Sequence, residues 1–313
     1  MSKVMFTSRR PYGRAENITA VFDAYDGEKE FIQEKWGAPD PRIFNCDVMV
    51  ADEFVPWSPG RLIMIGHGIS GGKSYGMLQP YGYHNARDAM LIDWVVCTSE
   101  ATIPLEANQY GVPLEKVLPL GMPRTDRYFG VRKGDGKTIL AGKRAYLFAP
   151  TFRNANEPRR PWIDWHHIDD LLTDDEILAV KPHMVTRHIL EGEYKHIVEI
   201  SSETSSGPYL IDCDVLITDY STIMLDAHVL GKPVVLFEKE HGFARKRGMW
   251  LPYPEGYASR FSINEDELIR EIRSAKYPQE ADLRCLELTA GACDGHSTER
   301  VVRLLKNVVE EIS

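Results

Sequence analysis

The chain has 313 residues, more than a single domain usually holds, so two domains of ordinary size are expected. Its 46 acidic and 37 basic residues give a net charge of −9, which argues against a nucleic-acid-binding protein, because such proteins normally carry a basic surface. A hydrophobic content of 43% and a charged content of 27% exclude a disordered or fibrous chain and are typical of a globular enzyme.

The N-terminal sequence MSKVMFTSRRPYG lacks the apolar core of a signal peptide. No stretch approaches the roughly 18 consecutive apolar residues that span a bilayer. We therefore expect a cytoplasmic protein, and a peripheral contact with the inner membrane surface stays open. The five cysteines form no C-x-x-C pair, so they predict reduced thiols rather than disulfides or a zinc site.

Short apolar runs alternate with segments of helical length. The runs are VMFTS, RIFNCDVMVAD, RLIMIG, DWVVCTS and KVLPLG in the first half, then AYLFAP, EILAVKP, HIVEI, DVLITD and PVVLF. Buried parallel strands have this composition and are connected by helices, so the pattern predicts a doubly wound α/β fold with two Rossmann-like halves. The polar, glycine-rich segment 131–144 is the expected join, which gives domains at 1–135 and 136–313.

Three helices can be predicted in the second half. The segment STIMLDAHVL is apolar on almost all sides of the predicted helix, and Gly231 is expected to end that helix. The segment SINEDELIREIR carries Ser262 and Glu265 at the spacing of a capping box. Near the end, one stripe at helical spacing is formed by Val301, Leu304, Leu305, Val308 and Ile312. This last helix is able to cross back onto the first domain.

The loop GHGISGGKSYG after RLIMI is similar to a P-loop, but its register is wrong, because His67 stands where the first glycine is required. A histidine at a strand end, with a glycine on each side, is expected at the carboxyl edge of the sheet, facing a cleft between the domains. Its unperturbed pKa of about 6.5 suits a general base. We interpret His67 as catalytic, with a structural histidine as the alternative.

The segment DVLITDYSTIMLD, residues 214–226, predicts a strand, a tight turn and a helix that begins near Ser221. Backbone N–H groups and the positive end of the helix would meet a diphosphate there. Ser221 and Thr222 add hydroxyl donors, and Asp226 could accept hydrogen bonds from a ribose. The alternative is that Asp219 and Ser221 only cap the helix.

Other polar residues also follow predicted strands. His183 would lie on the same edge as Ser221 and hold a phosphate oxygen, or else be a solvated loop histidine. Arg124 and Arg153 could neutralise phosphate charge through their planar donors, with surface ion pairs as the alternative. No metal site is expected: the D-x-D at 212–214 enters a buried strand, and the cluster at 166–170 lacks matched spacing.

Taken in order, the motifs resemble the CDP-glycerol glycerophosphotransferase family of wall teichoic acid and capsule synthesis. They are HG (67–68), LGMPRTD (120–126), FAPTFR (148–153), KPH (181–183), DVLITDYSTIMLD (214–226), KPVVLF (232–237) and DGHSTERV (294–301). The resemblance implies a GT-B fold, in which two Rossmann-like domains face a cleft and the C-terminal domain holds the nucleotide.

The resemblance also implies roles for single residues. The HG motif places the base at His67, beside Gly68, and the HP motif places a diphosphate contact at His183. The family's D-Y-S-S turn appears as residues 219–222, and its T-W-R as residues 151–153. Two features depart from the family: the loop HGISGGK is longer than H-G-T-P-x-K, and the first strand begins almost at residue 1.

The expected activity is transfer of glycerol phosphate from CDP-glycerol, or of a related polyol phosphate from its CDP ester, to a hydroxyl of a glycan or lipid-linked acceptor. CMP is released, and the product belongs to teichoic-acid-like or capsule polymers. No cofactor is required; Mg²⁺ is compatible with the chemistry, but no ligand set demands it. The alternatives are a GT-B glycosyltransferase that uses a nucleotide sugar and a non-catalytic protein that binds anionic glycans.

Overall fold

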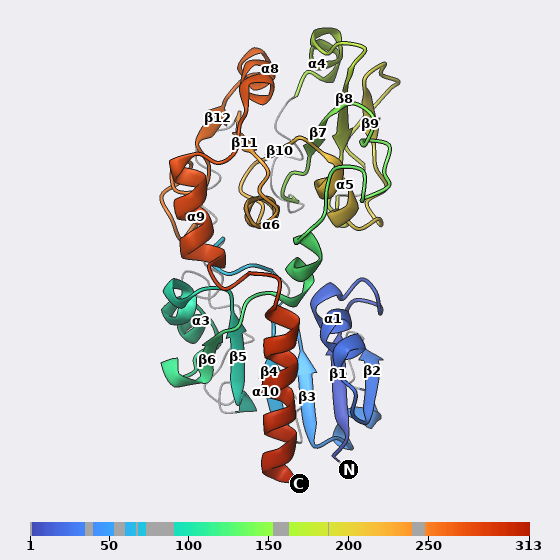
Figure 1. Cartoon of the computed structure of the whole chain (residues 1–313). Coiled ribbons are helices and arrows are strands. Elements are labelled where there is room, and N and C mark those ends of the chain that lie inside the picture. Colours follow the sequence, from blue (N-terminus) through green and yellow to red (C-terminus); the bar gives the residue numbers. More distant parts are fainter. Residues whose placement is uncertain are drawn as a thin grey trace. The chain divides into compact units, whose positions relative to one another are not determined.

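The computed structural model describes residues 2–34, 40–52, 60–66, 68–72, 91–152, 163–186, 188–239 and 248–313. The chain divides into two compact units, one formed by Met1–Phe129 with Glu287–Ser313 and the other by Gly130–Leu286. The first unit thus ends six residues before the predicted boundary at 135. It includes the last helix, for which the sequence analysis had left a return to the first domain open. Each unit contains a parallel sheet with helices (Figure 1).

The sheet of the first unit has the strand order β2-β1-β3-β4-β5-β6, and every described pairing in it is parallel. The strands are β1 (Val4–Ser8), β2 (Lys29–Gln33), β3 (Val48–Ala51), β4 (Arg61–Met64), β5 (Trp94–Cys97) and β6 (Val117–Pro119). The chain adds β2 on one side of β1 and β3 on the other. The carboxyl ends of β1 and β3 therefore form the topological switch point, where such sheets bind ligands.

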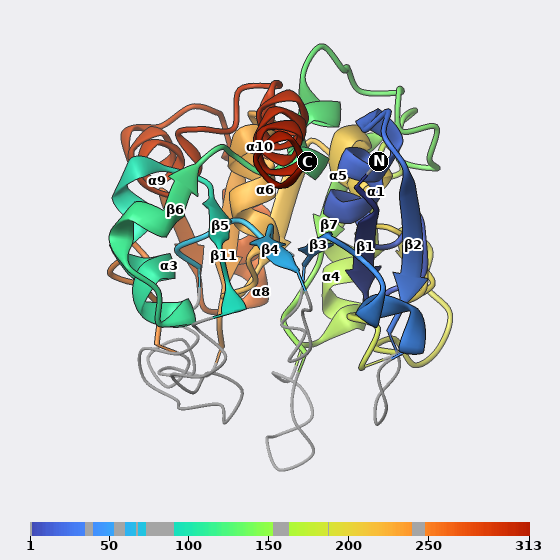
Figure 2. The ribbon, with the colours of Figure 1, turned by 90° about the horizontal axis from the view of Figure 1, so that it is seen from below.

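Alternate residues of these strands pack on opposite faces of the first sheet. Val4 and Phe6 contact the face that carries α1 (Glu16–Ala24) and α10 (Ser297–Ile312). Met5 packs on the other face with residues of α3 (Ile103–Tyr110). Figure 2 shows α1 and α10 on one side of the row of strands and α3 on the other. The apolar stripe predicted near the C-terminus is buried at Val301, Leu305 and Val308, whereas Ile312 is exposed.

The sheet of the second unit has the order β12-β11-β10-β7-β8-β9, again with parallel pairings. The strands are β7 (Arg144–Phe148), β8 (Glu176–Val180), β9 (Ile197–Glu199), β10 (Val215–Thr218), β11 (Val234–Phe237) and β12 (Arg260–Ser262). Counted within the unit, this is the strand order of a Rossmann fold, and its switch point lies between β7 and β10.

Helices α4 (Trp165–Leu171) and α8 (Glu265–Ser274) supply residues to one core of the second unit. Helices α5 (Gly207–Asp212) and α6 (Ile223–Val229) contact β7, β10 and β11. Helix α9 (Glu280–Ala290) runs across the second division point of the chain. Among the described residues, no helix combines the length and the apolar character needed to cross a membrane.

The start of α8 differs from the prediction. Ser262 does not cap it, because this residue is the last of β12 and pairs with β11. Asn264 is the cap instead, and its side chain accepts a hydrogen bond from the backbone N–H of Glu267 at 2.9 Å. Glu265 accepts from the Lys239 ammonium at 2.7 Å. The capping-box prediction was therefore wrong by two residues.

The described part of the chain also contains short 3-10 helices. They are η1 (Pro41–Phe44), η2 (Glu100–Thr102), η3 (Leu114–Lys116) and η4 (Pro123–Tyr128). Of these, η1 occupies the start of the run RIFNCDVMVAD, so only the end of that run is a strand. The segment η4 follows β6 at the carboxyl edge of the first sheet.

Candidate functional site

Three adjacent strands at the centre of the second sheet end in loops that carry the predicted phosphate-binding residues. The strands are β10, β7 and β8, and they are neighbours in that order. Their loops begin at Asp219, Ala149 and Lys181. The carboxyl ends of parallel strands meet at one edge, so residues from three separate parts of the sequence come together there.

A buried carboxylate joins two of these loops at the switch point. Asp219 is 3% exposed, and its Oδ1 accepts hydrogen bonds from the backbone N–H of Thr151 at 2.9 Å and from the Thr151 hydroxyl at 2.7 Å. The hydroxyl of Thr218 donates to the carbonyl oxygen of Ala149 at 2.6 Å. Strands β7 and β10 are thus held together just beyond the end of their regular pairing.

The imidazole of His183 is held against the same loop. Its ring centroid lies 4.9 Å from that of Phe152. The backbone N–H of Val185 donates to His183 Nδ1 at 3.2 Å, which leaves the proton of the neutral ring on Nε2. Lys181 is 7% exposed and donates to the carbonyl oxygen of Ser202 at 3.1 Å. Residues 151 and 152 therefore contact both Asp219 and His183.

The turn after β10 leads into α6, which begins at Ile223, two residues after Ser221. Ser221 and Thr222 are half-buried, and Thr222 occupies the N-cap position without a capping hydrogen bond from its side chain. Asp226 is 4% exposed, so its carboxylate lies in the interior, and its contact with a ribose stays a prediction. Arg153 directly follows Phe152 and lies outside the described residues.

The first unit also has a carboxylate at its switch point. The hydroxyl of Ser8, at the end of β1, donates to Asp52 Oδ2 at 3.0 Å, and both residues are buried. Gly66 follows β4 with φ of 72°, a conformation that favours glycine. Gly68 is half-buried, whereas His67 lies outside the described residues. Arg124 is half-buried in η4.

A buried acid lies beside the glycine-rich loop. Burial raises the pKa of Glu106 to about 7, although a hydrogen bond with Ser70 acts in the opposite direction. The backbone N–H of Ser70 donates to Thr98 Oγ1 at 3.0 Å. That hydroxyl in turn donates to the carbonyl oxygen of Thr289 at 2.5 Å. The loop after β4 is therefore linked, through the end of β5, to the returning C-terminal segment.

A family model described as CDP-glycerol:poly(glycerophosphate) glycerophosphotransferase matches residues 61–307. The chain belongs to this family. It is 27% identical to the teichoic acid ribitol-phosphate polymerase TarL of Staphylococcus aureus, over 95% of this chain and 58% of that protein. It is 29% identical to the teichoic acid poly(ribitol-phosphate) polymerase of Bacillus spizizenii, over 66% of this chain and 36% of that protein. The chain thus spans less than two thirds of either relative.

Solved structures confirm the predicted GT-B fold class. The wall teichoic acid polymerase TagF superposes with a TM-score of 0.79 and 15% identity, over 100% of this chain and 90% of that chain. A UDP-GlcNAc 2-epimerase from Neisseria meningitidis has a TM-score of 0.59 and 12% identity, over 97% of this chain and 99% of that chain. At these identities the likeness shows the fold alone.

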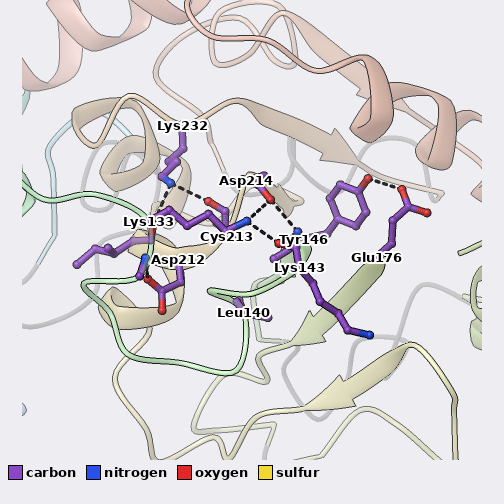
Figure 3. A network of polar contacts seen from close by, with 12 residues as sticks. Lys133, Leu140, Lys143, Tyr146, Glu176, Asp212, Cys213, Asp214 and Lys232 are labelled. Atoms are coloured by element: carbon purple, nitrogen blue, oxygen red, sulfur yellow. Dashed lines mark hydrogen bonds and ion pairs between the residues drawn. The ribbon is translucent and has the colours of Figure 1, made fainter. Parts of the chain in front are cut away.

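The D-x-D at 212–214 has a structural role in this family member, as Figure 3 shows. Asp212 accepts hydrogen bonds from the segment that opens the second unit, at Gly134 N (2.8 Å), Gly136 N (3.0 Å), and Thr138 N and Oγ1 (2.8 and 2.7 Å). Asp214 accepts from the Lys133 ammonium at 2.5 Å and from the backbone of Ala145. Among the described residues, no cluster of metal-ligating side chains is found.

The histidines and aspartates at 166–170, the other group for which no metal site was expected, also make structural contacts. Asp169 accepts hydrogen bonds from the backbone N–H groups of Lys195 at 2.8 Å and His196 at 2.7 Å. His167 lies 3.2 Å from Asp266. These side chains anchor α4 to its neighbours.

Sequence reasoning did not single out Thr151, Phe152 or Asn17 as site residues. Thr151 and Phe152 stand within the T-W-R-like motif, and their position after a strand was the signal that could have included them. Asn17 belongs to no motif, and its contacts are with residues 49 and 107 positions away. Nothing local in the sequence distinguishes it from any asparagine near a helix start.

Proposed function

We propose that this protein transfers the polyol phosphate of CDP-glycerol, or of a related CDP-polyol, to a hydroxyl group of a glycan or lipid-linked acceptor. Membership of the glycerophosphotransferase family supports this reaction. Relatives in Bacillus subtilis and Staphylococcus aureus are named a teichoic acid glycerol-phosphate primase and a ribitol-phosphate polymerase. The observation that carries the proposal is the contact of Thr151 with Asp219 and of Phe152 with His183, which gathers three loops at the switch point.

In the proposed reaction, the acceptor oxygen attacks the β-phosphorus of the CDP-polyol. A new phosphorus–oxygen bond forms, the bond from the β-phosphorus to the bridging oxygen breaks, and CMP leaves with that oxygen. His67 takes the proton of the acceptor hydroxyl. Phosphoryl transfer depends mainly on positioning and electrostatic stabilisation, so no protein nucleophile is needed.

The second unit supplies the groups that bind the diphosphate in this scheme. His183 donates from Nε2, Arg153 adds a planar pair of donors, and the turn at Ser221 and Thr222 offers hydroxyl and backbone donors. The tie between Asp219 and Thr151 fixes the loop that leads to Arg153. Asp226, which is 4% exposed, is assigned to the contact with the ribose.

The first unit supplies the acceptor side. His67 with Gly68 follows β4, and Arg124 follows β6, so both loops lie at the carboxyl edge of one sheet. Arg124 is assigned to neutralise negative charge on the substrate. The acceptor is a glycan or a lipid-linked molecule, and a lipid-linked acceptor would bring the protein to the cytoplasmic face of the membrane. Mg²⁺ bound to the substrate diphosphate is compatible with this assignment.

The proposal is tested with the full chain, CDP-glycerol labelled in its glycerol, and a lipid-linked glycan as acceptor. We expect label to appear in the acceptor with the wild type. His67→Ala abolishes transfer and retains CDP binding, whereas Ser221→Ala weakens CDP binding. Failure of the wild type to transfer from either CDP-glycerol or CDP-ribitol contradicts the proposal. CDP binding without any transfer supports a non-catalytic binder instead.

A further inference from the structure

The side chain of Asn17 connects two loops of the first unit. Its Nδ2 donates to the carbonyl oxygen of Gly66 at 3.1 Å, and its Oδ1 accepts from the backbone N–H of Arg124 at 3.0 Å. Gly66 follows β4, Arg124 lies in η4 after β6, and Asn17 is in the first turn of α1. One amide group thus links three segments that are distant in the sequence.

The burial of Asn17 indicates a specific structural requirement. The residue is 2% exposed, and an amide buried without partners would cost about 1–3 kcal/mol. Here its donor and its acceptor are both used, each by a backbone group. The asparagine amide supplies its N–H donors and its acceptor oxygen on two separate atoms, so it can bond two backbone groups at once. Aspartate would keep the acceptor but set an oxygen against the Gly66 carbonyl.

The two loops joined by Asn17 are those that carry proposed substrate contacts. Gly66 directly precedes His67, and its φ of 72° is a conformation that favours glycine. On the far side of His67, the backbone N–H of Ser70 is held by Thr98 at 3.0 Å. The backbone is therefore anchored on both sides of the histidine, by Asn17 before it and by Thr98 after it.

We propose that Asn17 is a positioning residue that fixes the backbone at Gly66 relative to the backbone at Arg124. This inference rests on the proposed function, in which His67 acts as the base and Arg124 binds substrate charge. Asn17 touches neither the substrate nor the reacting atoms in this scheme. It acts through the two loops, and a shift of about 1 Å in such a loop is enough to slow the reaction substantially.

The test compares Asn17→Ala and Asn17→Asp with a matched control. The control is Asp93→Ala, because Asp93 accepts a hydrogen bond from the backbone N–H of Leu62 at 2.8 Å, at the opposite end of the same strand β4. Both alanine variants remove a side chain that holds backbone at an end of β4. Asn17→Asp preserves the side-chain volume and the contact with Arg124. It therefore serves as the second variant if Asn17→Ala does not fold.

We expect kcat for polyol-phosphate transfer to fall by roughly 10- to 100-fold in both Asn17 variants, with KM for the CDP-polyol changed by less than about twofold. Asp93→Ala lowers the melting temperature and leaves kcat within about twofold of the wild type. An Asn17→Ala protein with wild-type kcat overturns the inference. So does an equal loss of kcat in Asp93→Ala, because that result points to general destabilisation.

Hydrogen exchange tests the same inference without any turnover, so failure of the proposed function can be distinguished from failure of this one. In Asn17→Ala, exchange of the Arg124 amide and of amides 66 and 68–72 is expected to rise at least tenfold, since the Arg124 N–H loses its acceptor. Asp93→Ala is expected to raise exchange at Leu62 only. Unchanged protection of Arg124 in Asn17→Ala contradicts the positioning role.

Discussion

Removing the Asp212 carboxylate should detach the segment that opens the second unit. Asp212 is fully buried and accepts four hydrogen bonds from residues 134–138. Burial alone would raise its pKa, but the hydrogen bonds from Thr138, Gly134 and Gly136 hold the pKa of this carboxyl below its usual value. The residue is therefore an anion in the native protein, matched by donors from a single loop (Figure 3).

The expected loss of stability follows from the number of hydrogen bonds that Asp212 accepts. The loop that donates them is only half-buried, so water can replace part of what is lost, and a net value of about 1 kcal/mol for each bond is appropriate. Asp212→Ala is therefore expected to lower the free energy of unfolding of the second unit by about 4 kcal/mol. Asp212→Asn keeps one acceptor and sets an amide N–H against Thr138, so its expected loss is about 2 kcal/mol.

The assay is urea unfolding at pH 7, with Asp135→Ala as the control. Asp135 lies on the same loop, is exposed, and accepts one backbone hydrogen bond at 2.7 Å, so its removal should cost less than about 1 kcal/mol. The contribution of Asp212 is present above its unfolded pKa and disappears as the pH falls below about 4. Mg²⁺ or Mn²⁺ should change the melting temperature of the wild type and of Asp212→Asn equally. If Asp212→Ala is as stable as the wild type but loses a rise in melting temperature caused by the metal ion, Asp212 is a metal ligand, and its proposed structural role is refuted.

Two further predictions concern the first unit. Because burial raises the pKa of Glu106 to about 7, the native carboxyl keeps a proton that the unfolded chain has released above about 4.3, so stability falls by about 1.4 kcal/mol per pH unit between these values. Glu106→Gln should remove that slope in denaturant unfolding at pH 5, 6 and 7, and an unchanged slope would show that Glu106 is not its source. Gly121 has φ of 84°, and an added Cβ would lie 2.4 Å from the carbonyl oxygen of Ala292. Gly121→Ala should therefore lower stability by about 2 kcal/mol or more and expose amides 290–293 to exchange; wild-type stability would contradict the close approach.

The interior strands could be predicted from the sequence because they are buried on both faces and read as apolar runs. Strands β2 and β12 were missed because neither carries a continuous apolar run, whereas the edge strands β6 and β9 do and were predicted. In β2, KEFIQ, only Ile32 is fully buried, so no continuous apolar run marks it. The position of Ser262 at the end of β12 was hidden for the same reason, and the predicted helix cap was then placed two residues too early.

One part of the candidate site could be predicted from a general rule, namely that the carboxyl ends of parallel strands meet at one edge of the sheet. Polar residues after strands were expected at one edge. Asp219 and Ser221 follow β10 and His183 follows β8, and these two strands flank β7 in the second sheet. The strand order, which makes β7 and β10 neighbours, is a property of the whole fold. The hydrogen bond of Thr151 with Asp219 depends on that order, and the hydrogen bond of Asn17 with Gly66 depends on the packing of α1 against the first sheet. No local sequence pattern predicts either of them.

The nucleotide released during turnover tests the central claim most directly. The full chain is incubated with the CDP-polyol and acceptor, and the nucleotides are separated and quantified against the phosphodiester product. Attack at the β-phosphorus predicts one CMP for each polyol phosphate transferred, and no CDP. Release of CDP, or turnover of a nucleotide sugar with release of a nucleoside diphosphate, would instead place the attack at a carbon atom and contradict the account.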